Sequence, residues 1–124
     1  MRANSADPRF RDPAEAVRLA KRAITIHPND GAVWNTLGIC HYRAGDWKES
    51  TEALAKSMAL RKGGDSFDWF FLAMAHWQLD QKAEAQKWYG RAVEWMQKNQ
   101  HKNPELVRFR AEAAELLGLE KTPK

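Results

Sequence analysis

Apolar side chains recur along this chain at intervals of three and four residues, and short segments rich in polar residues, glycine or proline separate the apolar stretches. This spacing puts the apolar residues on one face of an α-helix, and no segment keeps the strict alternation of a half-buried strand. The pattern therefore predicts an all-α protein. We expect helices over roughly 13–26, 31–44, 47–62, 67–79, 81–99 and 104–117.

Residues that favour helix ends mark these predicted boundaries. Asp12-Pro13 and Asn103-Pro104 each place an N-cap side chain before proline at the first helical position. Asp46, with Glu49 three residues later, predicts a capping box at the start of the third helix. Asp80 is predicted to cap the fifth helix. The turns between helices are therefore short, and short turns join helices into antiparallel hairpins.

One pattern of residues occurs twice, 35 residues apart. In the first helix of each predicted hairpin, Trp34, Leu37 and Gly38 recur as Trp69, Leu72 and Ala73. In the second helix, Ser50, Leu54 and Ser57 recur as Ala85, Tyr89 and Ala92. Small residues in this pattern allow two helix backbones to approach closely, and the large ones fill the space between them. A fixed period of this length predicts stacked helix hairpins.

At these residues the chain resembles the tetratricopeptide repeat, whose signature is an aromatic residue, Leu-Gly, and then small and aromatic residues on the second helix. The resemblance implies a short right-handed α-solenoid of antiparallel hairpins, closed by a C-terminal capping helix. It also implies a non-catalytic module that binds other proteins. The chain departs from the signature at His41 and His76, which occupy positions where the family often has an aromatic residue.

The resemblance divides the chain into segments, and we expect them to be part of a longer bacterial protein. They are a flexible tail (1–11), the second helix of a partial repeat (12–30), two full repeats (31–65 and 66–102), a capping helix (103–118) and a tail (119–124). The first helix has no cap of its own. Ala16, Val17 and Ala20 are therefore expected to face either missing sequence or a second copy of the chain, as in a homodimer.

The first helices of the two full repeats are expected to line a concave groove that holds an extended peptide or a partner helix. The residues assigned to this groove are Asn35, Ile39, Tyr42, Arg43, Phe67, Phe70, Phe71, Met74, Trp77 and Gln78, with Thr36 beside them. Such an aromatic face would bury the apolar side chains of a partner. Alternatively, the capping helix or the tails cover it. A clamp for a C-terminal carboxylate is not expected, because only Asn35 and Arg43 supply suitable donors.

Binding of single-stranded RNA is the main alternative function. Asn35-Thr36-Leu37 and the 35-residue spacing resemble pentatricopeptide repeats, but Phe70-Phe71 replaces Asn35-Thr36 in the second copy. The net charge of +4, from 20 basic and 16 acidic residues, is spread along the chain and forms no basic stripe. Nucleic-acid binders concentrate their basic residues, so nucleic acid is not the expected partner.

The chain shows no pattern of catalytic or metal-binding residues. It has no glycine-rich phosphate loop and no nucleophile paired with a base. Cys40 and His41 point about 100° apart on a helix, whereas zinc needs three or four converging ligands. We therefore expect no enzyme activity, no cofactor and no metal, and we expect His41 and His76 to be packed and hydrogen-bonded.

The expected location is the cytoplasm. Cys40 is the only cysteine, so the chain has no internal disulfide, which favours a reducing compartment. No apolar run approaches the roughly 20 residues that cross a bilayer, and residues 1–11 do not resemble a signal peptide.

Overall fold

The computed structural model describes residues 12–119. This range contains six helices and no strand. The helices are α1 (Pro13–Ile26), α2 (Gly31–Arg43), α3 (Trp47–Leu60), α4 (Ser66–Gln78), α5 (Lys82–Asn99) and α6 (Pro104–Leu117). The all-α prediction is confirmed. The expected tails lie outside the described residues, apart from Leu119.

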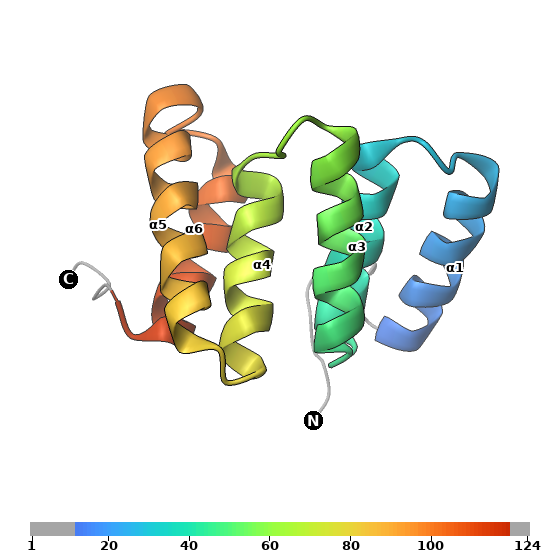
Figure 1. Cartoon of the computed structure of the whole chain (residues 1–124), viewed down its shortest axis with the longest axis horizontal. Helices are drawn as coiled ribbons and strands as arrows, with labels where there is room; N and C mark the ends of the chain where they lie inside the picture. Colours follow the sequence, from blue (N-terminus) through green and yellow to red (C-terminus); the bar gives the residue numbers. More distant parts are fainter. Residues whose placement is uncertain (1–11, 120–124) are drawn as a thin grey trace.

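The helices stack as antiparallel hairpins along a row that runs from α1 to α5 (Figure 1). Helix α2 packs chiefly against α3, and α4 packs against α5. Helix α1 lies on α2, and α6 lies on α4 and α5 at the other end of the row. This arrangement confirms the predicted solenoid of stacked hairpins, in which each hairpin buries its apolar face against its neighbours.

Trp34 and Trp69, which lie 35 residues apart, make equivalent contacts. The indole N–H of Trp34 donates to the carbonyl of Pro28 at 2.8 Å, and that of Trp69 donates to the carbonyl of Gly63 at 3.1 Å. Each bond ties the first helix of a full repeat to the loop before it. The guanidinium of Arg91 also lies 5.0 Å from the centroid of the Trp69 ring. Both rings therefore combine packing with a satisfied N–H.

The predicted N-cap of α3 is at the expected residue but lacks its side-chain bond, and the predicted N-cap of α5 is at the wrong residue. Asp46 is the N-cap residue of α3 but makes no side-chain capping bond, and its carboxylate lies 3.2 Å from Nδ1 of His41. Gln81, not Asp80, precedes α5, and its side-chain oxygen lies 2.6 Å from Nδ1 of His76. Both side chains bind the histidine near the end of the preceding helix, which closes each hairpin turn. The expectation of hydrogen-bonded histidines is confirmed.

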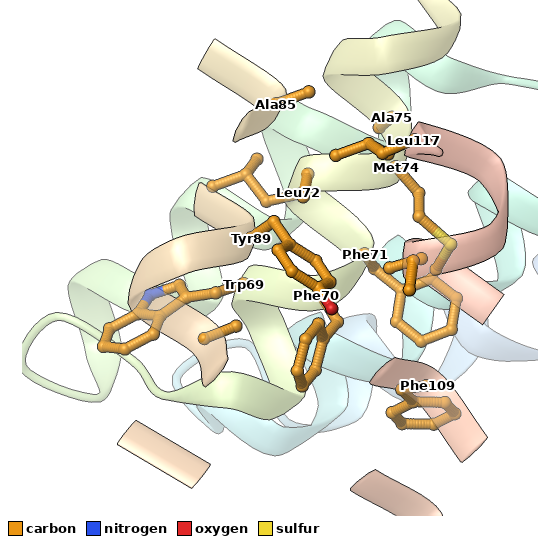
Figure 2. Close-up of a cluster of buried hydrophobic side chains, with 14 of the residues drawn as sticks. Trp69, Phe70, Phe71, Leu72, Met74, Ala75, Ala85, Tyr89, Phe109 and Leu117 are labelled. Carbon is orange, nitrogen blue, oxygen red and sulfur yellow. The ribbon is translucent and has the colours of Figure 1, made fainter. Parts of the chain in front are cut away.

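The main hydrophobic core surrounds α4. The side chains of Phe70, Phe71 and Met74 are 0% exposed. Figure 2 shows Tyr89 of α5 beside Phe70, and Phe109 of α6 beside Phe71. Helix α4 is therefore enclosed by its neighbours on several sides, which explains why most of its residues are buried.

A buried carboxylate joins the two full repeats. Asp68 of α4 is fully buried, and its Oδ1 accepts hydrogen bonds from Asn35 Nδ2 at 2.7 Å and from Ser57 Oγ at 2.8 Å. Its Oδ2 accepts one from the guanidinium of Arg61 at 3.2 Å. Removal from water raises the pKa of Asp68, and this effect outweighs the hydrogen bonds and the positive charge beside it. The group links α2, α3 and α4.

Asp68 is expected to make stability fall as the pH rises. Its folded-state pKa lies above the ordinary value of 3.8, so its contribution is fully present below that pH and is lost as the pH rises through the folded-state pKa. In the variant Asp68→Asn, the asparagine side chain does not titrate. Urea unfolding of both proteins should therefore show that the free energy of unfolding of the wild type, minus that of the variant, decreases as the pH is raised from about 3.5 to 7. A difference that increases would contradict this assignment.

Candidate functional site

A groove of about 830 Å³ opens between α1 and α6. Helix α1 contributes four apolar residues to its lining: Ala16, Leu19, Ala20 and Ala23. Helix α2 contributes Ala32, Asn35, Thr36, Ile39 and Cys40. Phe67 at the start of α4 and Glu105, Arg108 and Phe109 of α6 complete it. The lining is mostly apolar with a few polar groups, as is typical of sites that bind apolar groups.

An ion pair joins α2 to α6 one helical turn beyond the groove residues of each helix. The guanidinium of Arg43 binds both carboxylate oxygens of Glu112, with NH2 lying 2.9 Å from Oε1. The same guanidinium lies 5.1 Å from the centroid of the Phe71 ring. This two-point contact fixes the direction of Arg43. It holds α6 in place across the groove and uses a side chain that was expected to contact a partner.

The prediction of an exposed aromatic face is wrong at Tyr42, Phe70, Phe71 and Met74. Tyr42 is 9% exposed, and the other three side chains are 0% exposed. Helix α6 packs on α4 and places Phe109 4.7 Å from the ring centroid of Phe71, whereas the ring beside Phe70 is that of Tyr89 of α5. Tyr42 packs edge-on against the other side of this cluster. At Phe71 the alternative, coverage by the capping helix, is the one observed.

Two more predicted residues lie away from the groove. Trp77 and Gln78 stand at the opposite end of α4 from Phe67. The ammonium group of Lys82 lies 3.9 Å from the centroid of the Trp77 ring, and Gln78 Nε2 donates to the hydroxyl of Tyr42 at 3.3 Å. Both residues are partly exposed, but neither belongs to the groove lining.

Three of the ten predicted residues line the groove: Asn35, Ile39 and Phe67. Asn35 was expected to face a partner in the groove. Instead its side-chain NH₂ donates both to the carbonyl of Phe67 at 3.1 Å and to Asp68 at 2.7 Å. These bonds use both amide hydrogens, so this NH₂ is not free to donate to a peptide or to a base of RNA.

The residues that sequence reasoning missed are those of α1 and α6. The expectation that Ala16 and Ala20 of the partial repeat face missing sequence or a second copy was the available signal for the α1 side. No sequence signal places α6 across from α1, because that position depends on the curvature of the whole stack. Glu105, Arg108 and Phe109 could therefore not be assigned to the groove in advance.

The expected docking face of α1 also needs a correction. Val17 is 9% exposed and Ala20 is 5% exposed, because both pack with Leu37 and Cys40 of α2. Val17 is therefore part of the fold and does not face missing sequence or a second copy. The large apolar residues that α1 does expose are Leu19, at 51%, and Ile26, at 67%.

Within residues 12–119, no group of three or more His, Cys, Asp or Glu side chains could hold a metal ion. Across the same residues, no helix has the length and apolar character needed to cross a membrane. Every buried side-chain nitrogen or oxygen in the described part of the chain has a hydrogen-bond partner.

In a comparison with protein families, the tetratricopeptide repeat model matches residues 10–66. The matched segment comprises α1 and the first full repeat, α2 and α3. No significant match was found among curated proteins. The second hairpin repeats the contacts of the first at a spacing of 35 residues, as the two tryptophans show. The matched segment and its structural repetition together support a tetratricopeptide repeat protein.

Proposed function

We propose that this chain is a non-catalytic protein-binding module whose groove between α1 and α6 accepts an apolar segment of a protein partner. Tetratricopeptide repeats generally mediate interactions between proteins. The observation that carries the proposal is Leu19, which lines the groove and leaves 51% of its surface in water. Burial of such a side chain against a partner is favourable by about 25 cal/mol per Å² of apolar surface.

The chemistry of the groove defines the kind of partner. Ala16, Ala20 and Ala23 form a wall with short side chains, so the backbone of a helix or strand can approach α1 closely. Ile39 and Phe67 supply larger apolar surfaces on the facing side. Glu105 and Arg108 place one charge of each sign on the α6 side, where the polar residues of a partner would lie. This arrangement supports an amphipathic partner, with its apolar face toward α1 and α2.

The proposal also includes a location in the cytoplasm. Cys40 is buried and is the only cysteine in the sequence, so the chain forms no internal disulfide, as is typical of proteins in a reducing compartment.

A photo-reactive amino acid at Thr36 tests the groove. Thr36 is exposed and lines the groove on α2, so a benzophenone side chain there should form covalent adducts with whatever protein occupies the site. We expect adducts after irradiation of cells that produce the chain, identified by mass spectrometry. Leu19→Arg should lower their yield by about tenfold or more, because it places a charge in the apolar contact.

The matched control carries the same photo-reactive residue at Ala55. This residue is exposed on α3 and lies outside the groove lining. It should give few adducts, and Leu19→Arg should not change them. Equal adducts from Thr36 and Ala55, or adducts at Thr36 that survive Leu19→Arg, would show that the groove is not the binding site.

A further inference from the structure

In the complete hairpin α2–α3, the second helix contacts the first through a row of small and apolar residues. This row consists of Ser50, Ala53, Leu54 and Ser57, and none of them is more than 4% exposed. It fits against α2 at Gly38, where a Cβ atom would lie only 2.6 Å from Cγ of Leu54. The hydroxyl of Ser50 also donates to the carbonyl of Gly38 at 2.7 Å. A second helix of this fold thus needs a first helix that carries a small residue.

Helix α1 carries the corresponding row 34 residues earlier in the chain: Ala16, Leu19, Ala20 and Ala23. We call this set the α1 row. All four residues line the groove, and no first helix covers them in the described part of the chain. The largest difference is at Leu19, which is 51% exposed whereas its counterpart Ala53 is 4% exposed. Ala20 is buried because it also packs with residues of α2, and Ala16 and Ala23 are partly exposed. The wall of the groove on α1 is therefore a surface shaped to contact a first helix.

Helix α6 has the character of a first helix. Its N-cap Asn103 accepts from the backbone N–H groups that follow it, as Asp30 and Asp65 do at α2 and α4. Counted from these caps, Val107 corresponds to the position of the tryptophans, and Ala111 corresponds to Gly38 and Ala73.

In α2 and α4 these positions contact the second helix of the same hairpin. In α6 they are exposed: Val107 has 47% of its surface in water, and Ala111 is also exposed. We call Val107 and Ala111 the α6 row. It lies on a different side of α6 from Phe109, which lines the groove. The α6 row is therefore available while α6 remains packed on α4.

Building on the groove as the binding site, we propose that the occupant is a second copy of the chain, whose α6 row packs on the α1 row. The two rows have the small and apolar character of the two sides of one hairpin, and they lie at opposite ends of the row of helices (Figure 1). One copy would supply the first helix and the other the second helix of a repeat formed between two molecules. Such contacts are head to tail, so each dimer keeps a free α1 row and a free α6 row.

The composition of the α6 row sets the strength of this contact. Arg110 occupies the position of Leu37 and Leu72, so the junction between copies is more polar than the junction inside a hairpin. Val107 also offers less surface than Trp34 or Trp69. We therefore expect weak, concentration-dependent association, with a dissociation constant between about 10 μM and 1 mM.

The test uses two variants that each block one row. Leu19→Arg places a cation in the α1 row, and Ala111→Arg places one in the α6 row. Both residues are exposed, so circular dichroism should show unchanged folding. Sedimentation velocity should show dimers and larger species for the wild type at about 1 mM, and monomers for each variant alone. A mixture of the two variants should form dimers and nothing larger, because only one intact pair of rows remains.

Ala55→Arg is the control with the same added charge on the exposed side of α3, and it should assemble like the wild type. The proposal is overturned if the wild type is monomeric at about 1 mM, or if the mixture of the two blocked variants stays monomeric. Either result would rule out assembly of the chain with itself. The proposed function would still stand if the photo-adducts formed at Thr36 contain another protein. Loss of the groove itself would instead appear as equal adducts from Thr36 and Ala55.

Discussion

Asp68→Ala is expected to lower the free energy of unfolding by about 3–5 kcal/mol, the usual cost of removing one partner from a buried charged group. Alanine would leave the amide of Asn35, the hydroxyl of Ser57 and one guanidinium N–H of Arg61 without their acceptor. Its smaller volume would also leave a cavity beside α3. Burial raises the pKa of Asp68, which shows that its ionisation costs free energy. The larger effect is that three hydrogen-bond donors would lose their shared acceptor.

Urea unfolding at pH 7 measures this effect, with Ser57→Ala as the companion variant. Ser57→Ala removes one neutral donor and leaves Asp68 with Asn35 and Arg61, so it should cost only about 1 kcal/mol. If Asp68→Ala costs no more than Ser57→Ala, the carboxylate does not hold the two repeats together.

Phe71→Ala is expected to lower the free energy of unfolding by about 3–5 kcal/mol, as large-to-small changes of buried phenylalanine do. The Phe71 ring is 0% exposed and makes edge contacts with Tyr42 of α2 and Phe109 of α6. Its removal would therefore open a cavity where α2, α4 and α6 meet. Figure 2 shows the Phe71 side chain directed toward α6 within this cluster.

The chain offers a matched control for Phe71, because Thr36 holds the same position one repeat earlier. Thr36 is exposed, so Thr36→Ala should change stability by no more than about 0.5 kcal/mol. Thermal unfolding followed by circular dichroism compares the two variants. A similar, small effect for both would mean that Phe71 lies on an open surface, as the sequence had suggested.

The helices and their stacking could be predicted from the sequence because both depend on local patterns. Apolar spacing, N-cap residues and the 35-residue recurrence of Trp34 and Trp69 each report on neighbouring residues or on one repeated unit. The errors at Asp46 and Asp80 concern side chains with more than one possible hydrogen-bond partner. In each hairpin turn, the histidine of the preceding helix is bound by a nearby polar side chain, and sequence spacing does not show which polar group will be used.

The groove was less predictable than the fold. Ile39 and Phe67 were found because the first helices of such repeats line the concave side. Phe71 follows the same rule in sequence, yet it is buried, because the next helix, α6, packs over α4. Asp68 is a related case: its counterpart one repeat earlier is Val33, so the repeat pattern itself would suggest an apolar residue. Its partners come from α2 and from the C-terminal end of α3, and they are brought together only by packing.

By itself, the sequence determined that this protein is a stack of helix hairpins, because periodicity, caps and the repeated small and large residues act over short distances. Only the tertiary structure decided which surfaces remain in water. Helix α6 covers Phe71 of α4, while α1 keeps Leu19 exposed in a groove. Exposure depends on which helix lies across a given face, and that is set by the curvature of the whole stack, to which every junction between repeats contributes.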